Sequence, residues 1–174
     1  FIDDAPVQIL VNNAGIHDDA PMAGMSRQQW HSVLDVTLNG TFRCTRAALR
    51  LMESQGHGAI VNNASVLGWR AQPGQAHYAA AKAGVVSLAT SLAVEWAPKV
   101  RVATVSPGLV LTEQSHLHFG DTDGIAATPC DICPAGAFVR AGQVWRMRVG
   151  CVTDAGTCCV WRGLVGSSLD VCCG

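Results

Sequence analysis

Two residues that could exchange a proton stand four positions apart. The chain has a single tyrosine, Tyr78, and Lys82 is one of only two lysines. In a helix, this spacing places the phenol and the ammonium on the same face. Hydride chemistry on a carbonyl needs a proton donor that can return as a base, and a phenol with a pKa of about 10 is poorly matched to neutral pH. Because a nearby cation favours the phenolate and lowers that pKa, the pair predicts a general acid–base.

A hydroxyl that could hold a substrate oxygen precedes this pair. Ser65 lies 13 residues before Tyr78, just after the apolar segment 58–62, which we expect to form a buried strand. Open α/β sheets bind their ligands at the ends of the strands. Ser65 is therefore a candidate for hydrogen bonding to a substrate carbonyl.

Strands and helices alternate around these residues. Buried strands are predicted over residues 8–12, 58–62 and 100–105. A first helix begins at a capping box formed by Ser26 and Gln29 and ends at the Gln55–Gly56 break, and a second covers residues 76–97 and ends before Pro98. This order is typical of a parallel α/β sheet, and right-handed crossovers place both helices on one of its faces.

Several motifs together resemble the short-chain dehydrogenase/reductase family over about residues 6–120. They occur in the family's order and approximate spacing: Asn12-Asn13-Ala14-Gly15, Ser65, Tyr78-Ala-Ala-Ala-Lys82 and Ser106-Pro107-Gly108. The resemblance implies a partial doubly wound, Rossmann-type parallel sheet. It also implies NAD or NADP as cofactor and a small-molecule alcohol or carbonyl as substrate.

The resemblance assigns roles to individual residues. Tyr78 is similar to the family's general acid/base, Lys82 to the residue that lowers the pKa of that tyrosine and binds the nicotinamide ribose, and Ser65 to the substrate clamp. Cofactor binding is implied for residues at the ends of two strands and on the second helix: Asn12, Ala14, Gly15, Tyr78, Lys82, Pro107, Gly108 and Thr112. The two helices would also form the contacts of a homo-oligomer.

The chain differs from the family pattern in the first helix. The family has an Asn before a Leu there, whereas this chain has Thr37 before Leu38. Asn39 lies two residues further, about 200° around the helix, and so cannot simply substitute. Either the Thr37 hydroxyl anchors the water of a proton relay or the relay is impaired.

A second difference concerns the start of the chain. The family's first strand and Gly-rich phosphate-binding turn precede the Asn-Asn-Ala-Gly motif, but here only 11 residues do. We therefore expect the pyrophosphate-binding segment to be absent from this chain. The strand at residues 8–12 would then be a bare apolar edge.

The last part of the chain is different in character. We divide the chain into a partial Rossmann-type domain, residues 1–128, and a Cys-rich tail, residues 129–174, which holds seven of the eight cysteines. Their spacing does not match a zinc ribbon, so we predict no metal site. Our hypothesis is that the tail is an out-of-frame translation. The six histidines also lack metal-ligand spacing, and we interpret most of them as surface or loop residues.

Composition excludes several other classes of protein. The net charge of -1 offers no electrostatic footprint for nucleic acid, and no apolar run reaches the roughly 18 residues of a membrane span. We therefore predict a cytoplasmic oxidoreductase that transfers a hydride between a nicotinamide cofactor and an alcohol or carbonyl substrate. The alternatives are an inactive fragment that serves as a scaffold or assembly piece, and a Cys-rich metal-binding appendage.

Overall fold

The computed structural model describes residues 6–70, 72–108 and 110, together with the backbone of 111, 139–140, 160–162 and 171–172. Three parallel strands form the centre of the fold: β1 (Ile9–Asn12), β2 (Gly58–Asn63) and β3 (Val100–Ser106). Their register aligns Leu10 with Ile60 and Ile60 with Val102. The predicted parallel α/β sheet is thus confirmed.

The helices lie where the sequence places them. The first predicted helix consists of α1 (Arg27–Leu34), a π-helical turn (Asp35–Asn39) and α2 (Gly40–Gln55). The capping box is present, because Ser26 and Gln29 exchange backbone-to-side-chain hydrogen bonds of 3.1 and 2.9 Å. Gly56, with φ of 77°, ends α2 in the left-handed conformation that glycine tolerates best. The second predicted helix is α3 (Ala76–Trp96).

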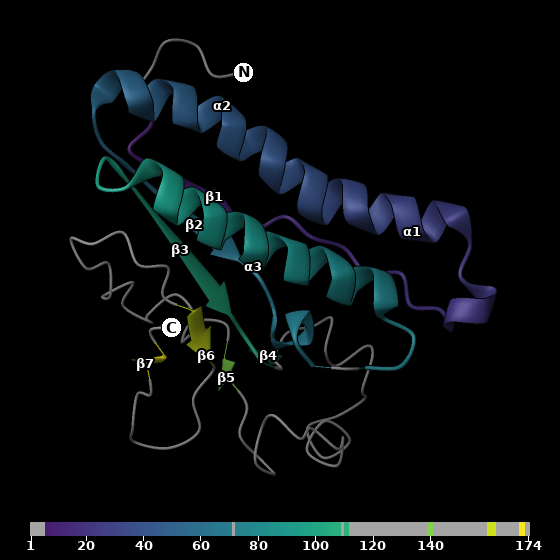
Figure 1. Ribbon diagram of the computed structural model, residues 1–174. Helices are drawn as coiled ribbons and strands as arrows, with labels where there is room; N and C mark the ends of the chain where they lie inside the picture. Colours follow the sequence, from purple (N-terminus) through teal and green to yellow (C-terminus); the bar gives the residue numbers. More distant parts are fainter. Residues whose placement is uncertain are drawn as a thin grey trace.

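Helices α2 and α3 cover the same face of the sheet, as predicted (Figure 1). The core between them and the sheet takes residues from both helices and from two strands: Ala48, Leu49, Met52, Ile60, Ala89, Ala93, Val100 and Val102. The buried positions alternate in β2, whereas β3 buries Val102, Ala103 and Thr104 in succession. This burial on both faces fits the short continuous apolar segments from which the strands were predicted.

Strand β1 exposes apolar side chains at one edge of the sheet, on the face opposite to α2 and α3. Strand β1 lies at one end of the five-stranded order β1-β2-β3-β6-β7. Its Ile9 and Val11 side chains are 65% and 43% exposed. The predicted apolar edge is therefore present among the described residues.

Short strands follow β3 that the sequence pattern did not predict. They are β4 (Val110–Leu111), β5 (Val139–Arg140), β6 (Val160–Arg162) and β7 (Val171–Cys172), and β6 pairs in parallel with β3. Strands of two or three residues are too short to produce a periodic signal. The remainder of the Cys-rich tail lies outside the described residues. Of its cysteines only the backbone of Cys172 is described, so the statements about these cysteines stay predictions.

Among the described residues, no helix combines the length and the apolar character that a membrane span requires. The same residues contain no group of three or more His, Cys, Asp or Glu side chains arranged to hold a metal ion.

Gly58 allows β2 to pass under α2, and we expect the Gly58→Ala change to destabilise the protein. A Cβ at this position would lie 2.4 Å from Cγ and Sδ of Met52, which is fully buried. We expect a loss of about 1–3 kcal/mol in the free energy of unfolding, measured by denaturant titration. Gly24→Ala is the matched control, because nothing lies within 4 Å of its added Cβ. Equal stabilities for the two variants would contradict the prediction.

Candidate active site

The candidate residues converge at the carboxyl ends of the parallel strands. Ala14 and Gly15 follow β1, Ser65 follows β2, and Pro107 and Gly108 follow β3. Ser65 begins a 3-10 turn (Val66–Gly68) through a 3.2 Å hydrogen bond that its hydroxyl accepts from the Leu67 amide. That turn packs against α3, where a Cβ on Gly68 would come within 3.2 Å of the Ala83 backbone nitrogen. A glycine at this position thus lets Ser65 approach the helix that carries Tyr78.

Tyr78 lies in the first turn of α3 and is half-buried. Burial raises the pKa of Tyr78, the nearby Ser65 hydroxyl opposes this effect, and the negative charge of Asp19 adds to it. The phenol is therefore neutral at physiological pH in the protein without ligands.

Lys82 follows one helical turn later and is only 3% exposed. Its Nζ donates a 2.5 Å hydrogen bond to the Asn63 carbonyl and lies 5.6 Å from the centre of the Tyr78 ring. Burial lowers the pKa of Lys82 to about 8.

That Lys82 lowers the pKa of Tyr78 stays a prediction, and in the protein without ligands Lys82 does not offset the burial of the phenol. The pKa of Tyr78 is raised, because burial of the phenol is the largest effect. The Lys82 ammonium is directed to the Asn63 carbonyl, and its own burial disfavours the charge that would stabilise a phenolate.

Thr37 and Gly15 lie beside Lys82. A Cβ on Gly15 would be 3.4 Å from Nζ of Lys82 and 3.5 Å from Oγ1 of Thr37. Thr37 is buried in the π-helical turn, a type of turn frequent at functional sites, and accepts a hydrogen bond of 3.4 Å from the Ile16 amide. Asn39 is exposed and donates to Asp35 instead. Position 37, and not 39, therefore faces the candidate site.

Asn12 supports the sheet. Its buried side-chain amide donates hydrogen bonds of 2.9 Å to Thr45 in α2 and to Asn62 in β2. Asn63 makes a similar bond of 2.9 Å to Asn13. These amides tie β1 to β2 and α2 just where the strands reach the candidate site.

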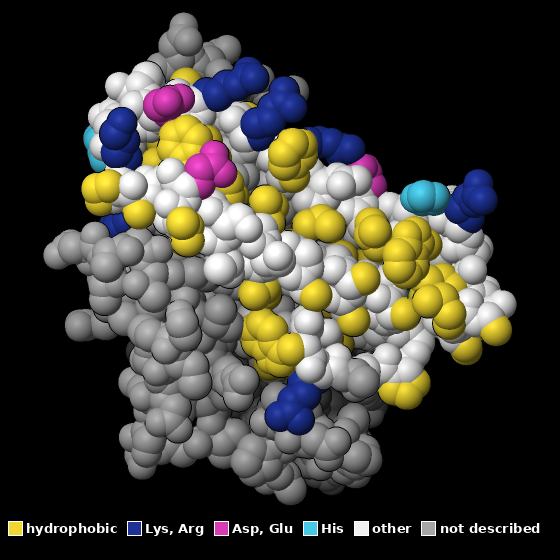
Figure 2. Space-filling model, viewed as in Figure 1, with side chains coloured by type: hydrophobic (Ala, Val, Ile, Leu, Met, Phe, Trp, Pro, Cys, Tyr) yellow, Lys and Arg dark blue, Asp and Glu magenta, His cyan; other side chains and the backbone are white. Residues whose placement is uncertain are grey.

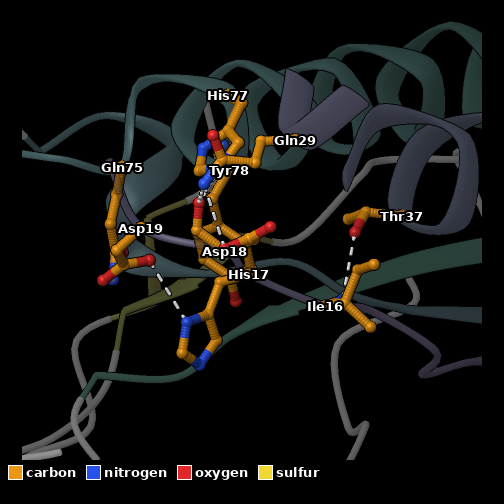
Figure 3. Close-up of polar contacts among 9 residues, drawn as sticks. All are labelled: Ile16, His17, Asp18, Asp19, Gln29, Thr37, Gln75, His77 and Tyr78. Atoms are coloured by element: carbon orange, nitrogen blue, oxygen red, sulfur yellow. Dashed lines mark hydrogen bonds and ion pairs between the residues drawn. The ribbon is translucent and has the colours of Figure 1, made fainter. Parts of the chain in front are cut away.

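Sequence reasoning missed the residues around the first turn of α3 (Figure 3). His77 is fully buried, so it is not one of the surface or loop histidines that the sequence analysis expects for most of the six. The edge of the His17 ring faces Tyr78 at 6.2 Å between ring centres, and His17 pairs with Asp19 at 3.2 Å. The position of His77 next to Tyr78 was the available signal, but a single histidine beside a candidate residue has no periodicity from which burial can be inferred.

The described residues beside Lys82 fit the nicotinamide half of a dinucleotide. An ammonium has three donors, and Lys82 makes a hydrogen bond to one acceptor, the Asn63 carbonyl, among the described residues. The absence of a side chain at Gly15 leaves the surface next to this ammonium accessible, and both Ala14 and Gly15 are exposed. Thr112, the remaining predicted cofactor residue, lies outside the described residues.

Comparison with known proteins adds independent findings. The family model described as short chain dehydrogenase matches residues 4–121. A hydroxy-methyl-oxo-hexahydroindene-carboxyl-CoA reductase of Mycobacterium tuberculosis is 46% identical over 143 residues, covering 81% of this chain and 53% of that protein. A 3-oxoacyl-[acyl-carrier-protein] reductase of Synechocystis is 35% identical, covering 84% of this chain and 65% of that protein.

Solved structures show the same likeness. A gluconate 5-dehydrogenase from Burkholderia cenocepacia, in complex with NADP and tartrate, is 30% identical with a TM-score of 0.78. The match covers 89% of this chain and 63% of that one. The chain thus spans between about half and two thirds of the length of these relatives. The Rossmann-type fold predicted from the sequence is confirmed.

Proposed function

Because the chain belongs to the short-chain dehydrogenase family, we propose that it carries the catalytic part of an oxidoreductase that interconverts an alcohol and a carbonyl group. The observation that carries the proposal is the convergence of three groups: the Ser65 hydroxyl, which is near enough to affect the pKa of Tyr78, the Tyr78 phenol, and the buried Lys82 ammonium one turn further along α3. The family's named relatives are reductases and dehydrogenases, which favours this function over the inactive scaffold.

The three side chains divide the chemistry between them. In the reductive direction, the Tyr78 hydroxyl gives its proton to the substrate oxygen, and the Ser65 hydroxyl holds that oxygen by a hydrogen bond. The Lys82 ammonium then stabilises the phenolate left on Tyr78 until it takes a proton from solvent. In the oxidative direction, the same phenolate removes the proton from the alcohol.

NAD or NADP, when bound, supplies or accepts the hydride at the substrate carbon. Residues at the ends of β1 and β3 and on α3 would hold its nicotinamide half: Asn12, Ala14, Gly15, Tyr78, Lys82, Pro107 and Gly108. Thr112 remains a prediction for the same role. The choice between NAD and NADP stays open in this proposal.

The substrate class is proposed from the relatives. Two of them are named for acyl groups carried as thioesters, on coenzyme A or on an acyl carrier protein. An alternative substrate class is suggested by a similar solved structure, which is named a gluconate 5-dehydrogenase. We favour a ketone on a thioester-linked acyl group, because the relative with 46% identity acts on a coenzyme A thioester by its name.

The function is tested by assaying oxidation of NADH and NADPH with acetoacetyl-CoA and with 5-ketogluconate. We expect turnover with the thioester, and a loss of about 100-fold or more in kcat for Ser65→Ala, because its hydroxyl polarises the carbonyl. The absence of saturable cofactor binding in a folded sample would instead support the inactive scaffold. Stoichiometric zinc in the purified protein would support the metal-binding appendage.

We also propose a homo-oligomer formed through α2 and α3. Figure 2 shows apolar side chains spread over the helices that face the viewer. Phe42 in α2 is 47% exposed and Val94 in α3 is 78% exposed. We expect the double change Phe42→Glu and Val94→Glu to shift the protein to monomers in light scattering, whereas Arg50→Glu leaves assembly unchanged. A wild-type protein that is already monomeric would refute the proposal.

Location in the cytoplasm also stays a prediction.

A further inference from the structure

His77 is buried between the loop that follows β1 and the first turn of α3. Its Nε2 lies 2.8 Å from the Asp18 carbonyl oxygen, and its Nδ1 lies 2.9 Å from the backbone nitrogen of Tyr78. The ring is 0% exposed. Both ring nitrogens are therefore occupied by backbone groups, one on the loop and one on the residue proposed to transfer the proton (Figure 3).

The chemistry of the two partners determines the protonation of the ring. A backbone amide can only donate, so Nδ1 must carry a lone pair, and a carbonyl can only accept, so Nε2 must carry the hydrogen. His77 is thus a neutral imidazole in a single tautomer. An imidazole that bridges a fixed donor and a fixed acceptor holds both in position.

The first turn of α3 needs such a partner. The amides of the first helical turn have no acceptor within the helix, and the residue before α3, Gln75, makes no side-chain capping bond. The Gln75 side chain instead donates a 2.7 Å hydrogen bond to the Asp19 carboxylate. The His77 ring takes over the role of a cap for the amide of Tyr78 itself.

Further contacts hold the same loop against α1 and against the segment that precedes α3. The Ala20 amide donates a 3.0 Å hydrogen bond to the Gly74 carbonyl, and Gln29 of α1 donates to the carbonyl and the carboxylate of Asp18. Residues 18–20 and 74–78 therefore form one hydrogen-bonded unit. The unit begins three residues after Gly15, whose backbone lies against Lys82 and Thr37.

We propose that His77 is a positioning residue, which sets the backbone of Tyr78 through Nδ1 and joins it to the loop after β1 through Nε2. This inference rests on the proposed function, because it assumes that Tyr78 transfers the proton. His77 itself touches neither the phenol oxygen nor, by this proposal, the substrate. Its effect is on the placement of the phenol relative to Ser65 and Lys82, where small displacements reduce rate strongly.

Three substitutions separate the two contacts. In His77→Asn, Oδ1 occupies the same position along the side chain as Nδ1 and can accept from the Tyr78 amide. In His77→Gln, Nε2 occupies the position of the ring Nε2 and can donate to the Asp18 carbonyl. His77→Phe keeps the ring volume and removes both contacts. His31→Phe is the matched control, because His31 is exposed on α1.

We expect kcat to fall about 10-fold or more in His77→Phe and in His77→Gln, with little change in the KM for the cofactor, and to stay within about 3-fold of wild type in His77→Asn. Hydrogen–deuterium exchange of residues 16–20 should rise in the Phe and Asn variants and stay near wild type in the Gln variant. An unchanged kcat in His77→Phe, or an equal loss in the Asn and Phe variants, would overturn the proposal.

A readout without turnover keeps this test separate from the proposed function. The nitrogen chemical shifts of His77 in labelled wild-type protein should show a neutral ring with hydrogen on Nε2, and a charged ring or the other tautomer would overturn the inference. If no substrate is turned over by the wild type, the proposed function fails. The ring tautomer and the exchange of residues 16–20 would still decide whether His77 joins the loop to α3.

Discussion

Replacing Tyr78 with Phe should lower kcat by about 1000-fold, because the change removes only the hydroxyl that delivers the proton to the substrate oxygen. The ring keeps its place in the first turn of α3, half-buried and facing His17. We therefore expect folding and the KM for the substrate to change little. A decrease in kcat without a matching increase in KM is characteristic of a group that acts in the transition state.

The ionisation of Tyr78 can be followed directly, because it is the only tyrosine in the chain. The ultraviolet absorbance of tyrosinate then reports on this residue alone, and the signal should be absent from Tyr78→Phe. Since burial raises the pKa of Tyr78, the midpoint should lie above the ordinary value of 10.0 in the protein without cofactor. A midpoint below 10.0, or a variant that retains wild-type kcat, would contradict the assignment.

Replacing Lys82 with Met should abolish most activity and yet stabilise the protein at neutral pH. The ammonium is buried, and its pKa of about 8, against an ordinary value of 10.5, corresponds to a cost of about 3 kcal/mol for keeping the charge in the folded state. Met is of similar length and carries no charge. Because the hydrogen bond to the Asn63 carbonyl is lost as well, we expect a net gain of about 1–3 kcal/mol at pH 7.

The lowered pKa of Lys82 also determines how the free energy of unfolding changes with pH. Between about pH 8 and pH 10.5, the unfolded chain holds a proton on Lys82 that the folded protein has lost. The free energy of unfolding of the wild type should therefore rise with pH across this window. The contribution of Lys82 to that rise should be absent from Lys82→Met, so the advantage of the variant at pH 7 should vanish near pH 10.5.

Urea titrations at pH 7 and pH 10 measure this difference, and kcat at pH 7 should be at least about 100-fold lower in the variant. The chain offers a matched control in its only other lysine, Lys99, which is exposed. We expect Lys99→Met to leave both activity and the pH dependence near wild type. A Lys82→Met protein that is less stable than wild type at pH 7 would show that the Asn63 hydrogen bond outweighs the burial of the charge.

Local patterns in the sequence predict the elements and the identity of the central chemical groups. Short apolar runs, the capping box at Ser26 and the glycine at position 56 are local signals, and local signals decide where a strand or helix begins and ends. The pairing of Tyr78 with Lys82 is equally local, because four residues are one turn of a helix. The convergence of Ser65 with this pair followed from the rule that parallel strands end at one edge.

The environment of these groups depends on how distant segments pack together. Burial raises the pKa of Tyr78 although a lysine lies nearby, and that effect depends on how α3 packs against the turn after β2. The same packing shows that Thr37 faces the site while Asn39 faces solvent. The sequence did not indicate that His77 is buried, because its burial and its hydrogen bond to Asp18 join segments 59 residues apart, whose contact no local pattern contains.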